Sequence, residues 1–251
     1  MISMRKTFFA TGMAVSLMSS TALASNHDQD VSGSATADSV ASDSATADSR
    51  AALATETEGR GFGPQSPRDI GQKEGENQRR FSVAPPATEM SLCDIHFHKS
   101  AEHRGGEFTQ YAGAGDDEGF GTGFEYDGEL TEAELAPTGD GAGDDDHAAL
   151  NPGDTIEIHF VYSTAQASLG NSLSTCLSDA TMNPQLRVES VVGVLVNDAE
   201  ATDFTEMARV EEVDGLNQAP NLPDNLGTPV VYLGSTTGPS YNEKGSNFQV
   251  T

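Results

Sequence analysis

The apolar residues of this chain are gathered into short runs, and this pattern restricts its possible folds more than any other feature. Each run is rich in Ile, Val, Phe or Tyr and is bounded by Gly, Pro, Asn or Asp, which is typical of β-strands. No long segment repeats its apolar residues with a helical period. The sequence therefore predicts a mainly β domain. The runs are Leu92 to His98, Thr155 to Tyr162, Leu186 to Val196 and Pro229 to Leu233.

Between the first two runs lies a segment of different composition, from Gly113 to Asp154. It is full of Gly and Asp and includes Asp144-Asp145-Asp146. Such a composition is typical of loops, so we expect a long solvated excursion from the domain. Within it a short helix is expected from Thr131 to Leu135.

The first 24 residues contain the parts of a secretory signal peptide in order. Arg5 and Lys6 are basic, an apolar run follows from Thr7 to Met18, and Ala22-Leu23-Ala24 is a small-residue cleavage site. We expect cleavage after Ala24 and a periplasmic or secreted protein. A retained membrane anchor is the alternative, but the apolar run is shorter than the roughly 20 residues that span a bilayer.

The next segment, residues 25–63, is rich in Ser, Ala and Asp and contains Ser-Ala-Thr-Ala-Asp-Ser twice, at 34–39 and 44–49. With so little apolar area to bury, it is predicted to be a disordered linker. Residues 64–251 have the length of one domain.

The chain carries 39 acidic and 13 basic residues, a formal net charge of -26. This charge argues against nucleic acid and membrane surfaces as partners. An acidic excess is more typical of solubility or adaptation to high salt, with calcium binding as a weaker alternative. The charge therefore limits the partners but does not identify a function.

The chain has two cysteines, Cys93 and Cys176. An even number in an oxidising compartment favours a disulfide, so we expect one between them. Two buried thiols are the alternative.

Among the six histidines, two are separated by one residue in Asp94-Ile95-His96-Phe97-His98. Alternate residues of a strand face the same side, so His96 and His98 project together, about 6 to 7 Å apart. His159, on the second run, could pair beside them and supply a third nitrogen. Three imidazoles leave a tetrahedral zinc ion one open position, which is the catalytic arrangement. A structural pair and a core histidine are the alternatives.

Two acids accompany these histidines: Asp94 lies two residues before His96, and Glu157 two before His159. Each acid shares a strand face with a proposed ligand and is placed to accept the N–H of a neighbouring imidazole. In the alternative interpretation, both acids point to solvent from an edge strand.

Four stretches in the same order resemble carbonic anhydrases, most closely the delta class and more distantly the alpha class. The resemblance implies reversible hydration of carbon dioxide to bicarbonate by a zinc-bound hydroxide, which is the reaction of a lyase. It also implies one domain around a central, mostly antiparallel sheet, with long loops and few short helices. Imidazole ligands equally suit cobalt or cadmium. The stretches are Leu92 to His103, Ile156 to Tyr162, Val191 to Val196 and Tyr232 to Pro239.

The resemblance also implies individual roles. It makes His96, His98 and His159 the metal ligands, with Glu157 behind His159. His103 matches a structural, hydrogen-bonding histidine. As a fourth ligand, the alternative, it would close the site.

Glu102 matches a buried acid that accepts the hydroxyl proton of a threonine. That threonine is Thr236, which can then only accept a hydrogen bond from the hydroxide and so orients it toward carbon dioxide. Thr237 would line the substrate side, although the two threonines could exchange places. The chain ends at Thr251 in an expected strand, where the family usually continues, so we expect a truncated C-terminus.

Two other functions use the same residues. An exported metal-capture protein would close the histidines around zinc, and the Asp-rich segment would recruit the ion. A metal-dependent ester hydrolase would use the same hydroxide with an acyl pocket.

Overall fold

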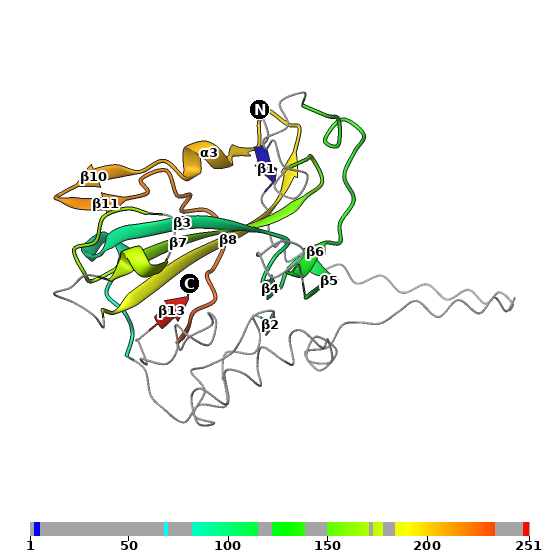
Figure 1. Cartoon of the computed structure of the whole chain (residues 1–251). Helices are drawn as coiled ribbons and strands as arrows, with labels where there is room; N and C mark the ends of the chain where they lie inside the picture. The colour runs from blue at the N-terminus through cyan, green and yellow to red at the C-terminus, as the bar shows by residue number, and fades with distance from the viewer. Residues whose placement is uncertain are drawn as a thin grey trace, which may run out of the picture.

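Three long strands form the centre of the fold in the computed structural model (Figure 1). They are β3 (Ser91–Lys99), β7 (Thr155–Ser163) and β8 (Leu186–Val196), and β7 pairs antiparallel with both neighbours. These strands coincide with three of the predicted runs, so the prediction of a mainly β, single-domain fold is confirmed. The structure describes residues 3–5, 68–69, 82–114, 122–138, 150–170, 173–177, 184–233 and 248–250.

Short strands extend the sheet beyond β8. β13 (Phe248–Val250) runs parallel to the start of β8, and β1 (Ser3–Arg5) runs antiparallel to its end. Outside these lie β12 (Tyr232–Leu233) and β9 (Thr202–Asp203). Only the last two residues of the fourth predicted run are therefore in a strand. The predicted linker and the rest of the predicted signal peptide lie outside the described residues.

The remaining elements are short. Helical structure is limited to η1 (Ala87–Glu89), η2 (Leu173–Cys176) and α3 (Phe204–Met207) in the part of the chain that the structure describes. Away from the central sheet, six strands pair two by two: β2 (Arg68–Asp69) with β4 (His103–Arg104), β5 (Phe108–Ala114) with β6 (Thr122–Tyr126), and β10 (Glu211–Val213) with β11 (Leu216–Gln218).

Successive side chains of a strand point to opposite sides, so the central sheet has two different faces. On one, which we call the apolar face, Ile158, Phe160 and Tyr162 of β7 pack with Leu92 and Val191 in one buried cluster. Each such side chain contributes about 1.5 to 3 kcal/mol when fully buried. The residues between them point to the other side, the histidine face.

The strand pairing shifts by one residue at Cys93, as in a β-bulge. Leu92 pairs with Tyr162 on the apolar face, whereas Asp94 pairs with Val161 and so belongs to the histidine face. Cys93 itself is bonded to Cys176 as a disulfide, and both are fully buried. The extra residue thus determines which side chains of β3 reach the site.

The prediction of a solvated excursion from Gly113 to Asp154 is wrong in part. β6 lies within it, and the Phe124 side chain is fully buried. Gly123 precedes it with φ +98°, and a Cβ there would lie 1.9 Å from the Ala101 carbonyl oxygen. Gly123 therefore allows a close backbone approach within a strand rather than forming part of a loop. Asp144-Asp145-Asp146 lies outside the described residues.

The helix expected from Thr131 to Leu135 is also wrong. The segment makes a single turn, closed by the Leu135 N–H donating to the Thr131 carbonyl at 3.1 Å. Thr131 and Glu134 cap this turn reciprocally. The turn cannot continue because Pro137 follows and disfavours helical backbone in the residue before it.

Candidate metal centre

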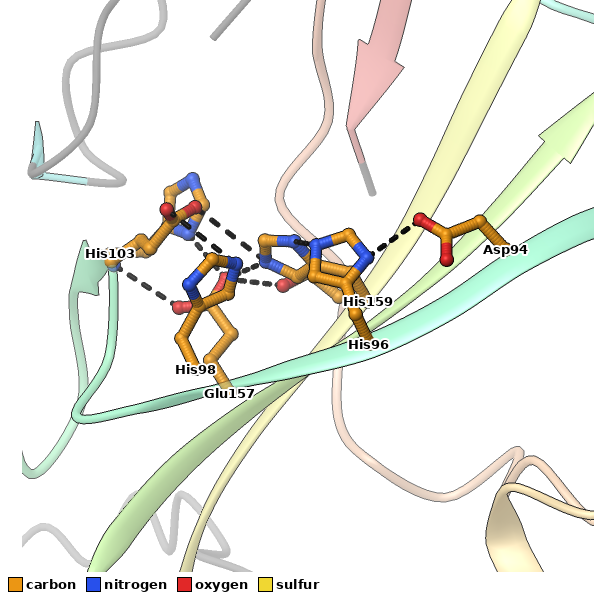
Figure 2. A network of polar contacts seen from close by, with 8 residues as sticks. Asp94, His96, His98, His103, Glu157 and His159 are labelled. Carbon is orange, nitrogen blue, oxygen red and sulfur yellow. Dashed lines mark hydrogen bonds and ion pairs between the residues drawn. The ribbon is translucent and has the colours of Figure 1, made fainter. Parts of the chain in front are cut away.

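The three predicted ligand histidines converge on the histidine face (Figure 2). His96 on β3 pairs directly with His159 on β7, and His98 lies two residues further along β3. The ring centroids are 4.8 to 5.1 Å apart, and the candidate ligand nitrogens lie within 4.8 Å of one another. Paired strands therefore bring together three imidazoles that could hold one metal ion.

Two buried acids orient two of these rings, those of His96 and His159, from behind. Asp94 accepts a hydrogen bond from Nδ1 of His96 at 2.7 Å, and Glu157 accepts one from Nε2 of His159 at 2.8 Å. The other nitrogens, Nε2 of His96 and Nδ1 of His159, then face each other at 3.2 Å. Each acid thereby selects the nitrogen that its histidine presents to the common centre.

Glu157 is fully buried yet has several donors. Its Oε1 accepts from Nδ1 of His103 at 2.5 Å and from the hydroxyl of Ser190, while its Oε2 accepts from the His103 backbone N–H at 3.3 Å. Burial raises the pKa of Glu157, but the charges and hydrogen bonds of His103 and His159 together outweigh burial and hold the pKa well below its ordinary value. The carboxylate is therefore ionised behind His159.

The titration of the candidate ligands His98 and His159 follows from the same surroundings. Burial lowers the pKa of His98, which keeps this ring neutral and able to bind a cation at neutral pH. Burial also acts to lower the pKa of His159, but the hydrogen bond and charge of Glu157 reverse the direction and raise it. A cation that binds at Nδ1 of His159 must therefore compete with a proton more strongly than at His98.

Glu102 and His103 reach the site from the segment after β3. Ser100 adopts the left-handed conformation, with φ +71°, where this segment begins. The Glu102 carboxylate oxygens lie 3.7 Å from Nε2 of His98 and 3.7 Å from Nε2 of His159. His103 is not among the three converging rings, and its Nδ1 donates to Glu157. It also belongs to a second, overlapping group with Glu102, Glu157 and His159 that could hold a metal ion. Thr236 and Thr237 lie outside the described residues.

Ser190 was not identified from the sequence. It lies within the Val-rich strand β8, directly opposite His159 in the sheet. Its neighbours in the sequence give no sign of this, because the contact depends on the register between β7 and β8. A sequence-based search could have found it only by pairing these two strands correctly.

The donor set suits a divalent transition metal. Three imidazole nitrogens are typical ligands of zinc, and equally of cobalt or cadmium. The side chains of His96, His98 and His159 are 31%, 18% and 10% exposed, so the centre is not sealed from solvent by the described residues. Three protein ligands and a position open to water are typical of catalytic zinc sites in general, whereas structural sites have four protein ligands.

The structure is thus that of a mainly β protein whose sheet carries three converging histidines that could hold a metal ion, with a buried acid behind two of them. Residues 87–251 match the family model described as Delta carbonic anhydrase. The chain therefore belongs to the delta carbonic anhydrase family, as the four sequence stretches indicated. No curated protein and no solved structure matches the chain. Among the described residues, no helix has the length and apolarity needed to cross a membrane.

Proposed function

We propose that the chain catalyses the reversible hydration of carbon dioxide to bicarbonate, with a divalent ion held by His96, His98 and His159. The observation that carries this proposal is the convergence of these rings from two paired strands, each strand also supplying an acid behind a ring. When bound, such an ion acts as a Lewis acid and lowers the pKa of a water molecule bound to it to about 7, a value known for carbonic anhydrases as a class. Zinc fits both the family and the ligands.

The residues of the chain would then position the reactants. Asp94 and Glu157 hold their histidines in one tautomer, so that no ring has to reorient during turnover. We assign Glu102 and Thr236 the relay that the family pattern implies. With Glu102 ionised, the Thr236 hydroxyl donates to it, and its oxygen can only accept a hydrogen bond from the attacking oxygen. Thr237 would line the substrate side.

The test is stopped-flow carbon dioxide hydration by purified protein of known metal content. We expect hydration by the wild type and its loss, together with the ion, in His159→Ala. His27→Ala is the matched control, because this histidine belongs to the predicted linker, and it should behave as wild type. Bound zinc without hydration over about pH 6 to 9, a range that brackets the expected pKa, would instead favour a metal-capture protein.

A second variant tests the relay separately. Thr236→Ala should lower turnover while the metal content stays at the wild-type level, because the threonine orients the nucleophile and does not bind the ion. Loss of zinc in this variant would mean that Thr236 is not the residue that plays this role.

We also propose export of the protein, with a signal peptide over residues 1–24, a linker over 25–63 and the enzyme domain over 64–251. The buried disulfide is compatible with an oxidising compartment. Mass spectrometry of protein recovered from the periplasm or medium should give an N-terminus at Ser25. Recovery of chains that still begin at Met1 would contradict the proposed cleavage.

A further inference from the structure

Ser190 occupies a position in β8 where a side chain can reach the metal centre without touching the ion. It pairs directly with His159 across the sheet, and its hydroxyl donates to Oε1 of Glu157, the oxygen that also accepts from Nε2 of His159. We infer that Ser190 is a positioning residue that holds the Glu157 carboxylate on His159. This inference rests on the proposed function, because it assigns a role to a residue of the same site.

Burial makes the orientation of Glu157 important. The side chain is fully buried, so every carboxylate lone pair without a donor is energetically costly. His103 donates to it from the segment after β3, whereas Ser190 donates from β8. Without the serine hydroxyl, His103 and His159 are the remaining side chains that donate to Glu157 in the described part of the chain. The carboxylate can then turn toward His103 and away from the ligand.

The sequence of β8 makes the serine stand out. It lies between Glu189 and Val191, in a strand whose following residues are Val, Val, Gly, Val, Leu and Val. Val would fit the strand better at this half-buried position, because β-branched apolar residues suit a pleated surface. A hydroxyl at this position is therefore most simply explained by the hydrogen bond that it makes with Glu157.

Two variants of nearly equal shape separate this role from a packing role. Ser190→Thr keeps the hydroxyl, and Ser190→Val replaces it with a methyl group on the same branched side chain. Both variants add one branch, so any steric effect is shared. A difference in zinc release between them therefore reports the hydroxyl group and not the added branch.

The experiment measures ion loss rather than turnover. The full chain is loaded with Zn²⁺, excess chelator is added, and zinc release is followed with time for wild type and both variants. We expect release from Ser190→Val to be about 10-fold faster than from Ser190→Thr, the lower end of the range for groups that support metal ligands. Ser190→Thr should stay within about twofold of wild type.

Equal release rates for the two variants would overturn the inference. So would a Ser190→Val protein that unfolds more easily without the ion but releases zinc no faster, because the serine would then serve folding only. A wild type that holds zinc but does not hydrate carbon dioxide refutes the proposed function alone, and the Thr and Val variants still decide the role of Ser190. A wild type that holds no zinc overturns both.

Discussion

The two faces of the central sheet are built from the same strands but differ in what their buried residues do. All nine residues of β7 are buried, yet Ile158 and Phe160 join an apolar cluster while Glu157 and His159 join a polar network. Burial stabilises the first pair directly. For the second pair it is unfavourable, and hydrogen bonds offset the cost. We therefore expect the apolar face to determine stability and the histidine face to determine ion binding.

The largest effect on stability is expected on the apolar face. Phe160→Ala removes a fully buried ring and should lower the free energy of unfolding by about 3 to 5 kcal/mol. Denaturant unfolding of the ion-free protein measures this change. Phe97→Ala, at a 37% exposed position on β3, is the matched control and should cost much less. If both variants lower the free energy of unfolding by the same amount, the apolar cluster is not the main source of stability.

The disulfide lies where the strand pairing shifts, and it packs against Val161 and Val188 on the histidine side of the sheet. Replacing both cysteines by alanine opens a link between positions 83 residues apart and should lower the free energy of unfolding by about 2 to 5 kcal/mol. Zinc release should also become faster, since the shift brings Asp94 behind His96. Unfolding curves and chelator-driven release measure the two effects. Unchanged release would show that the register holds without the bridge.

On the histidine face the expected effect is on the ion. Glu157→Gln keeps the side-chain shape but removes the charge behind His159, so zinc affinity should fall about 10- to 100-fold. Metal competition titrations measure this change. Glu125→Gln, which removes an exposed charge on β6, controls for the altered net charge and should bind as wild type. If affinity stays unchanged while stability falls, Glu157 supports folding rather than the metal centre.

The way the faces are built also explains how much of the fold and of the candidate site could be predicted from the sequence. Alternation within one strand is a local property, so it correctly placed His96 with His98 and each acid beside its histidine. Contacts between strands depend on register, which no local pattern contains, and Ser190 was missed for this reason. β6 was missed because a glycine required by a close backbone contact resembles a glycine of a loop. The prediction of a helix after Thr131 was wrong because Pro137 limits the segment to one turn.

The smallest effect is expected at the edge of the apolar face, where α3 covers the cluster with Phe204 and Met207. Asp203 caps this helix by accepting hydrogen bonds from the Thr205 backbone at 2.9 Å and the Thr205 hydroxyl at 2.6 Å. Asp203→Ala should therefore cost about 0.5 to 1 kcal/mol at neutral pH. Denaturant unfolding measures the difference from wild type.

The pH dependence of this cost separates the charge of Asp203 from its shape. The hydrogen bond from the Thr205 side chain lowers the pKa of Asp203 in the folded protein below its ordinary value of 3.8. The added stability is thus fully present above the ordinary pKa and is lost as the pH falls through the lowered one. Asp203→Asn is the matched control, because an asparagine caps helices equally well without a charge. Wild type should therefore lose stability relative to Asp203→Asn as the solution is acidified through this range. A difference between the two proteins that stays constant with pH would show that the charge contributes nothing to the cap.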